Sequence, residues 1–151
     1  MDYDDIISQI ALNCMLCLEK ISRQIKDKKR AIIFDIDETI ISLDGTLIQP
    51  IFAVYKFAKS VDIHPIFITN RHNHPSNIDS TMNQLISHGL PGPLMVIFRD
   101  IQEMNYYNAK LEARREVLSM GYDIVMSIGD RLWDIGEHGG IGILLPRKNN
   151  K

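Results

Sequence analysis

The sequence predicts an α/β protein with a three-layer, doubly wound parallel sheet of about five strands and helices on both faces. Two observations support this class. Short apolar runs alternate with longer amphipathic stretches along most of the chain. The runs are also apolar throughout, which is typical of parallel strands that are buried on both faces.

Five apolar runs are expected to form the strands: AIIFD (31–35), HPIFIT (64–69), LMVIF (94–98), YDIVMSIG (122–129) and GILL (142–145). The amphipathic stretches predict helices near residues 48–60, 76–89 and 106–120. Pro50 stands near the start of the first helix and Gly121 follows the last, as is common at helix ends. This alternation of strand and helix indicates a Rossmann-like sheet.

Residues 1–30 are expected to form an N-terminal helix and its exit. Apolar side chains recur three and four residues apart from Ile6 to Ile21, with acids at the start and KDKKR at the end. Cys14 and Cys17 form a C-x-x-C pair in this helix, which a redox pair or half of a zinc site would also show. No second such pair completes four zinc ligands, so we interpret both cysteines as packing residues.

Length and charge limit the function classes. A chain of 151 residues, 45% hydrophobic, fits one domain (1–151), with a catalytic core at 31–146 and a tail at 147–151. The formal net charge of -2 argues against general nucleic-acid binding. The start MDYDDIISQI lacks a secretory-signal pattern, and no run of about 18 apolar residues is present. We therefore expect a cytoplasmic protein without a membrane partner.

Polar residues follow the expected strands where they end. The first strand leads into Asp35 and Asp37, the second ends at Thr69, and the fourth is followed by Asp130 and Asp134. Ligands of such sheets bind at the carboxyl ends of the strands. Carboxylates that meet there repel one another unless a cation neutralises them. Oxygen ligands without a Cys or His set suit a hard ion, so the sequence predicts a Mg²⁺ site.

The D-x-D spacing of Asp35 and Asp37 suits phosphoryl transfer. Residues two apart on a strand point the same way, so both carboxylates can face one substrate. One can attack phosphorus while the other protonates the leaving group and later activates water. The Thr69 hydroxyl and the Lys110 ammonium are candidates to bind the oxygens of the phosphoryl group in transfer.

The segments FDIDET, FITNR, AKLEARREVLSMGYDIVMSIGDRLWDIG and GILLP resemble the haloacid dehalogenase (HAD) superfamily, and within it the class C acid phosphatases of subclass IIIB. The resemblance covers about residues 31–146 and implies that Asp35 is the nucleophile and Asp37 the general acid/base. It implies that Thr69 and Lys110 serve the transferred phosphoryl group. It further implies Mg²⁺ bound by Asp35, the main-chain carbonyl of Asp37, and Asp130, with Asp134 as an additional or outer ligand.

A carboxylate at Asp37 is what phosphatases of that superfamily carry, so the resemblance implies a phosphomonoesterase with an aspartyl-phosphate intermediate. The expected substrate is a small phosphorylated metabolite, with a nucleoside monophosphate as the example that the resemblance offers. Two alternatives stay open: a phosphatase of a macromolecular end, such as a polynucleotide or phosphoprotein, and a non-catalytic phosphate-binding module. The intact acid at Asp37 weighs against the latter.

The intervals between the motifs hold no full cap domain, because only 29 residues separate Thr39 from Thr69 and 40 separate Thr69 from Lys110. We expect an open site, or one that a neighbouring subunit covers, so a homo-oligomer is one option.

Several other polar and aromatic residues stand near the motifs. Asn70 and Arg71 follow Thr69 as in the class C relatives, and Arg71 is a candidate for binding phosphate or leaving group, against an ordinary loop ion pair. His72 and His74 are interpreted as exposed loop residues. For Trp133, burial against the sheet is favoured over stacking on a nucleobase. Arg114, one turn beyond Lys110, is expected to pair with Asp130 or Asp134.

Overall fold

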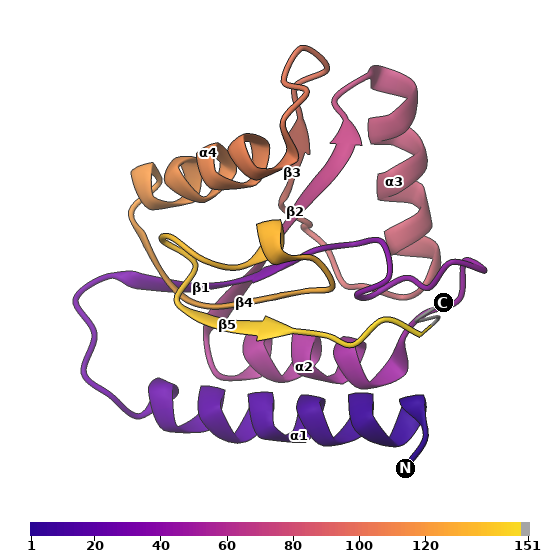
Figure 1. Ribbon diagram of the computed structural model, residues 1–151. Coiled ribbons are helices and arrows are strands. Elements are labelled where there is room, and N and C mark those ends of the chain that lie inside the picture. The colour runs from indigo at the N-terminus through magenta and orange to yellow at the C-terminus, as the bar shows by residue number, and fades with distance from the viewer. Residues whose placement is uncertain (149–151) are drawn as a thin grey trace.

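The computed structural model describes residues 1–148 and contains one five-stranded parallel sheet with the strand order β3-β2-β1-β4-β5 (Figure 1). The strands are β1 (Lys29–Phe34), β2 (Ile63–His72), β3 (Val96–Arg99), β4 (Tyr122–Gly129) and β5 (Ile141–Leu144). The predicted fold class is confirmed, and each strand overlaps the apolar run that predicted it. The last three residues of the expected tail lie outside the described part.

Helices separate most of the strands and lie on both faces of the sheet. They are α1 (Tyr3–Ser22), α2 (Gln49–Ser60), α3 (Pro75–Ser87) and α4 (Tyr106–Ser119), with a short 3₁₀ turn, η1 (Leu132–Asp134). In Figure 1, α1 and α2 lie on one side of the sheet and α4 on the other. None of the helices in residues 1–148 combines the length and the apolar character needed to span a membrane.

The two faces of the sheet bury separate apolar cores. Phe34 and Phe67 of the central strands pack with Tyr55 of α2 on one face, with ring centroids 5.6 to 5.9 Å apart. On the other face, Ala113 and Val117 of α4 cover side chains of β1, β2 and β4. Because a strand alternates its side chains between faces, both cores require strands that are apolar throughout.

The N-terminal helix packs beside α2 and buries its apolar side in the core on that face of the sheet. Asp2 caps it by accepting a hydrogen bond from Asp5 N at 2.8 Å. Cys14 is 1% exposed, and burial and the nearby Cys17 raise the pKa of its thiol to about 11. Cys17 is partly buried against the same core, and both cysteines are free. The described residues therefore fit the interpretation of both as packing residues.

The order of the strands places β1 between β2 and β4, so that their carboxyl ends meet at one edge. Phe34, the last residue of β1, pairs with Phe67 of β2 and with Ile128 of β4. The residues that follow Phe34 and Ile128, and those that follow Phe67, consequently emerge side by side. The link from β1 to α2 contains only isolated bridges, Asp37 with Ile41 and Ile41 with Leu47, and no cap domain.

Candidate active site

Asp35 leaves the end of β1 and is held by both neighbouring elements. Its main-chain N donates to Ile128 O of β4 at 3.0 Å, which continues the ladder one residue past the strand. The side chain of Thr39, fully buried four residues on, donates its hydroxyl to Asp35 Oδ2 at 3.2 Å. Asp35 is 9% exposed, so its carboxylate is largely buried at the carboxyl ends of the strands.

Lys110 contacts the same carboxylate from α4, which lies on the face of the sheet away from α1 and α2. Its Nζ lies 3.0 Å from Asp35 Oδ1 and 2.7 Å from Asp134 Oδ1, and it donates to Ile68 O at 2.6 Å. Burial acts to lower the pKa of this amine, but the charges of Asp35 and Asp134 outweigh it and the pKa is raised. At 2% exposure, Lys110 is thus a buried ammonium fixed by two acids and one carbonyl.

Three carboxylates form a cluster, and two of them contact this ammonium. Within residues 1–148, Asp35, Asp130 and Asp134 make the one group of three acid, His or Cys side chains whose ligand atoms lie within 4.8 Å of one another. Burial, followed by the charge of Asp35, raises the pKa of Asp130 to about 7 and also raises the pKa of Asp134. One ammonium among three buried carboxylates leaves excess negative charge, and all-oxygen donors suit a hard divalent cation.

A glycine permits the acid cluster to close. Gly129 ends β4 next to η1, and a Cβ built on it would lie 2.2 Å from Asp134 Cβ and 2.2 Å from Asp134 Oδ2. The turn then directs the Asp134 carboxylate back, where Oδ2 accepts a hydrogen bond from Arg131 N at 3.0 Å. Glycine at position 129 therefore has a steric cause, because any Cβ there would collide with Asp134.

Asp37 lies apart from this cluster. Its side chain is 60% exposed, and its two oxygens accept hydrogen bonds from Arg71: Nη2 to Oδ1 at 2.7 Å and Nε to Oδ2 at 3.0 Å. The remaining arm of Arg71, Nη1, donates to Thr81 Oγ1 at 2.9 Å and Gln84 Oε1 at 3.0 Å on α3. Of the two alternatives for Arg71, the structure shows an ion pair, and its partner is a candidate catalytic acid. Binding of substrate by Arg71 stays a prediction, as does a metal contact through the carbonyl of Asp37.

Thr69 and Asn70 lie near the end of β2. Thr69 is 2% exposed, follows the Ile68 carbonyl that Lys110 contacts, and accepts a hydrogen bond from Arg71 N at 3.1 Å. Asn70 O accepts a hydrogen bond from Arg99 Nε at 2.9 Å. The roles of Thr69 and Asn70 toward substrate stay predictions.

Two hollows flank Arg71 at this edge. One of about 210 Å³ is lined by residues that include Asp37 and Ser42. The other, of about 400 Å³, extends over Asn70 toward Arg99 and Tyr106. The acids and these hollows share one edge of the sheet, as the polar strand ends predicted.

The prediction that Arg114 pairs with an acid is wrong. Its guanidinium donates instead to two main-chain carbonyls, Glu137 O at 2.8 Å and Trp133 O at 3.0 Å. The helix places Arg114 one turn beyond Lys110, where it meets the loop around η1 rather than the carboxylates. Arg114 therefore supports the loop that carries the acids.

The prediction of Trp133 buried against the sheet is also wrong. Trp133 is half-buried and meets Tyr106 and Tyr107 of α4 edge to face, with ring centroids 5.3 and 5.5 Å apart. The η1 turn that points Asp134 inward directs the preceding side chain outward, toward the start of α4. Sequence spacing alone does not show this, because the two tyrosines are more than 20 residues away.

His74 is exposed, and its Nδ1 caps α3 by accepting from Ser76 N at 3.2 Å. His72 is partly buried and belongs to β2 rather than to a loop, because the strand continues to pair with β3 through His72 and Arg99. The sequence pattern assigns no role to Thr39, Thr81 or Gln84. The position of Thr39 in the D-x-D-x-T motif could have indicated its place in the site. No motif marks Thr81 and Gln84, the partners of Arg71 on α3.

Comparison with solved structures identifies the same fold elsewhere. The class C acid phosphatase from Bacillus anthracis matches with a TM-score of 0.75 and 19% identity, over 96% of this chain and 78% of that one. Its tungstate-bound structure gives 0.76 and 20%, with 96% and 78% coverage. A chain of the Pnkp1/Rnl/Hen1 complex gives 0.71 and 20% over 83% of this chain, which spans about half (49%) of that one. These identities show the fold alone.

The sequence itself carries the family assignment. No curated protein matches it closely enough to count as a relative. The family model for the HAD superfamily, subfamily IIIB (acid phosphatase), matches residues 43–148, a segment that includes Thr69, Lys110, Asp130 and Asp134. The resemblance drawn from the motifs is confirmed. The chain belongs to subfamily IIIB of the HAD superfamily, the acid phosphatases, and is a HAD-type phosphatase.

Proposed function

We propose that the protein is a Mg²⁺-dependent phosphomonoesterase that works through an aspartyl-phosphate on Asp35. The observation that carries this proposal is the buried Asp35 carboxylate, held between Lys110 and Thr39 beside two further acids. A carboxylate oriented by fixed donors is a suitable nucleophile, because its attacking oxygen needs little reorganisation. In the first step, an Asp35 oxygen bonds to phosphorus while the bond from phosphorus to the ester oxygen breaks.

Asp37 is the proposed acid and base. Protonated Asp37 gives its proton to the departing ester oxygen, and its carboxylate then takes a proton from the water that attacks the aspartyl phosphate. The products are inorganic phosphate and free Asp35, so the cycle closes. Arg71 supports this role by holding the Asp37 carboxylate through two hydrogen bonds. Its exposed position leaves Asp37 accessible to both leaving group and water.

Lys110 and Thr69 are proposed to bind the oxygens of the phosphoryl group. The raised pKa of Lys110 keeps it as an ammonium, which can offset charge on those oxygens. Thr69 supplies a hydroxyl at the end of the neighbouring strand. Asp134, 2.7 Å from Lys110, orients the ammonium.

The acid cluster fits Mg²⁺ in donor type and in excess charge. Asp35, Asp130 and the main-chain carbonyl of Asp37 would hold the ion, with Asp134 as an additional or outer ligand. When bound, Mg²⁺ supplies positive charge that offsets the phosphate charge during attack. The raised pKa of Asp130 fits this assignment. Its carboxylate form is destabilised by burial and by the neighbouring acids, and a bound cation would stabilise that form.

The proposed substrate class is a small phosphorylated compound. No cap domain stands over the strand ends in residues 1–148, and hollows of about 210 and 400 Å³ lie beside Arg71. These volumes accommodate a leaving group of modest size. The same openness also admits the phosphorylated end of a macromolecule.

The test is hydrolysis of an aryl phosphate in Mg²⁺ and in EDTA. We expect turnover with Mg²⁺, none after chelation, and recovery when the metal is returned. Asp35→Asn should stay folded and lose activity by several orders of magnitude, since an amide does not attack phosphorus. Asp123→Asn, an exposed acid of β4, is the matched control and should keep its rate. Sustained turnover in EDTA, or normal rates in Asp35→Asn, would contradict the proposal.

A further inference from the structure

An aromatic cluster stands beside the acid cluster and has no part in the chemistry above. Trp133 lies between Asp130 and Asp134 in the sequence, and its ring meets Tyr106 and Tyr107 edge to face. Tyr106 is 42% exposed and Tyr107 is 54% exposed. Trp133 contacts both tyrosines, and the tyrosine side chains remain open to solvent, so aromatic surface is exposed next to the segment that carries Asp134.

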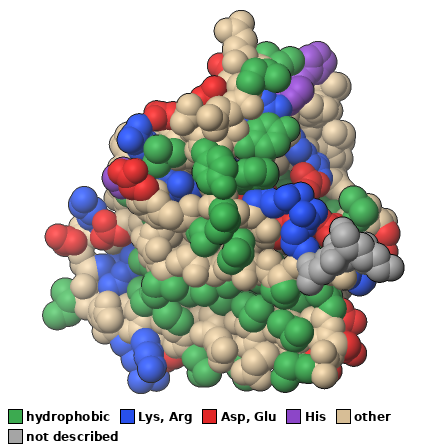
Figure 2. All heavy atoms as spheres, in the orientation of Figure 1, with side chains coloured by type: hydrophobic (Ala, Val, Ile, Leu, Met, Phe, Trp, Pro, Cys, Tyr) green, Lys and Arg blue, Asp and Glu red, His purple; other side chains and the backbone are tan. Residues whose placement is uncertain are grey.

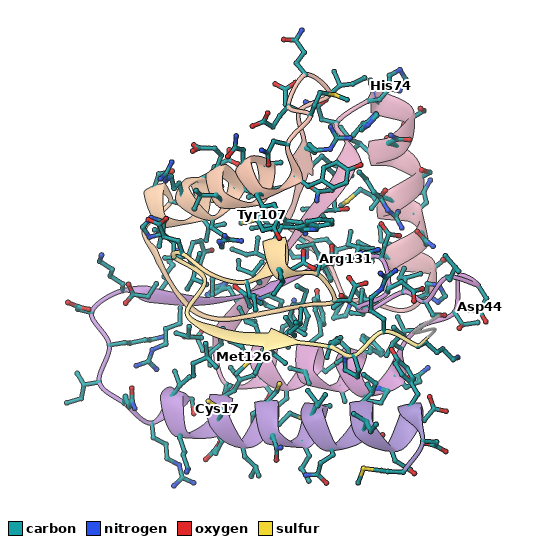
Figure 3. The ribbon with its side chains drawn as sticks, viewed as in Figure 1. Cys17, Asp44, His74, Tyr107, Met126 and Arg131 are labelled. Atoms are coloured by element: carbon teal, nitrogen blue, oxygen red, sulfur yellow. The ribbon has the colours of Figure 1, made fainter. Side chains whose placement is uncertain are left out.

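Two arginines lie over rings of this aromatic cluster. The guanidinium of Arg131 lies over the Trp133 ring at 5.6 Å, and that of Arg99 lies over Tyr106 at 5.0 Å. Figure 2 shows hydrophobic and Lys/Arg side chains next to one another over this region, and Figure 3 places Tyr107 and Arg131 beside η1. Arginine stacked on an aromatic ring is a common neighbour of bases and phosphates in proteins that bind single strands.

Arg131 and a further arginine, Arg147, lie near the acid cluster. Arg131 Nε lies 3.9 Å and Arg147 Nε 4.0 Å from Asp130 Oδ2. These separations are too long for hydrogen bonds. The side chains are 42% and 48% exposed, so their N–H groups can turn to an incoming anion.

A hollow connects Tyr106 of this aromatic cluster to the end of β2. The hollow of about 400 Å³ runs from Asn70 and Arg71 to Arg99 and Tyr106. Tyr106 in turn contacts Trp133. A ligand that follows this hollow away from the end of β2 meets the aromatic cluster at Tyr106.

We propose that this site takes the phosphorylated end of a single-stranded oligonucleotide. The terminal phosphate binds at Asp35, the adjoining base stacks in the aromatic cluster with Trp133, and the next phosphodiester pairs with Arg131 and Arg147. This inference rests on the proposed phosphatase function and names its substrate class. The net charge of -2 supplies no general attraction for nucleic acid, so recognition depends on this local surface.

The chemistry favours this occupant over two others. A mononucleotide carries a base for the aromatic cluster but no second phosphate for the two arginines. A phosphopeptide carries no obligatory planar group beside its phosphate. An oligonucleotide end has both, and the site offers both aromatic rings and arginines, with Arg131 lying over the Trp133 ring.

Trp133 is the only tryptophan of the chain, so its fluorescence reports on the aromatic cluster directly. The experiment titrates the non-hydrolysing Asp35→Asn protein, with Mg²⁺, against a four-nucleotide strand carrying a terminal phosphate, in 5′ and 3′ and in DNA and RNA versions. Saturable quenching is expected for at least one version. A phosphorylated abasic strand of equal length and glycerol phosphate should bind without quenching. No quenching by any version, or equal quenching by the abasic strand, overturns the proposal.

Variants separate stacking from charge. Trp133→Leu should weaken binding of a dye-labelled strand, followed by anisotropy, by about 5- to 100-fold, and Tyr107→Leu provides a second reading should the first variant unfold. Arg131→Gln and Arg147→Gln should each reduce the slope of log K against log salt by about 0.7. The control is Arg115→Gln, which changes an arginine paired with Glu112 within α4 and should leave the slope unchanged. Equal slopes in all four proteins overturn the phosphate contacts.

Competition experiments with unlabelled ligands identify the class of ligand that the site binds. A mononucleotide or a phosphopeptide that displaces the labelled strand as well as the unlabelled strand does would overturn the proposal. Hydrolysis of an aryl phosphate by the wild-type protein is measured in parallel. Hydrolysis without quenching rejects only this inference, whereas quenching without hydrolysis supports the stacking surface and rejects the catalytic proposal.

Discussion

Arg71 holds Asp37 by two hydrogen bonds, at 2.7 and 3.0 Å, and is itself anchored to Thr81 and Gln84 of α3. The exposed acid therefore has a fixed position, which an isolated side chain on a loop would not have. If Asp37 is the general acid, Arg71 contributes to catalysis by positioning it.

We expect Arg71→Lys to lower kcat by about tenfold or more for an alkyl phosphate, because lysine cannot form the two-point contact. An activated aryl phosphate, whose leaving group needs little protonation, should be affected much less. Steady-state rates on the two substrates measure the difference, and Arg115→Lys controls for the loss of an arginine elsewhere. An equal loss on both substrates would instead assign Arg71 to binding the phosphate.

The acid cluster predicts a pH-dependent stabilisation by Mg²⁺. Burial and the charges of Asp35 and Asp134 raise the pKa of Asp130 to about 7 in the metal-free protein. A carboxyl with a raised pKa in the folded state contributes stability that is fully present below its unfolded pKa, about 3.9, and is lost as the pH rises through about 7. A bound cation relieves this loss, so Mg²⁺ should stabilise the protein more at pH 8 than at pH 5.

Thermal unfolding with EDTA or MgCl₂, at matched ionic strength, measures this effect. At a hundredfold excess over its dissociation constant, Mg²⁺ should add about 2.7 kcal/mol at the higher pH. Asp130→Asn should be more stable than the wild type in EDTA at pH 8 and should lose most of the response to Mg²⁺. A stabilisation that is equal at both pH values would speak against the cluster as the metal site.

Gly129 predicts a steric effect on the site. A Cβ at this position would lie 2.2 Å from Asp134, so Gly129→Ala must displace that acid or the strand end. We expect a loss of about 1–3 kcal/mol in the free energy of unfolding, together with weaker binding of Mg²⁺. Chemical denaturation and metal titration measure the two effects. Gly92→Ala, where a Cβ meets nothing within 4 Å, is the control, and matching losses in both variants would contradict the steric explanation.

Most of the fold could be predicted from the sequence because the strands are buried on both faces. The run YDIVMSIG predicted β4 to the residue, and the other runs overlap their strands. β2 extends furthest past its run, since it continues three residues beyond Thr69 into a polar segment. Pairing with β3 extends it, and that pairing has no apolar signal in the sequence.

The meeting of Asp35, Asp130 and Asp134 was predictable for the same reason, since they follow strands whose ends meet. Asp37, expected with them, lies apart and pairs with Arg71. The partners of long side chains were not predictable. Arg71 and Arg114 have several donors and reach across elements, so their contacts depend on the positions of α3 and of the loop after η1. Trp133 depends on the direction of a three-residue turn, which residue types alone do not determine.

The central claim is that Asp35 becomes phosphorylated and that Asp37 serves both proton transfers, and trapping the intermediate tests it most directly. In Asp37→Asn, an activated aryl phosphate should still phosphorylate Asp35, while hydrolysis of the aspartyl phosphate slows because no base activates water. Intact mass after acid quench should show one added phosphoryl group, mapped to Asp35 by peptide analysis. A measurable burst of released phenol from protein that stays unmodified would contradict the account and indicate direct attack by water.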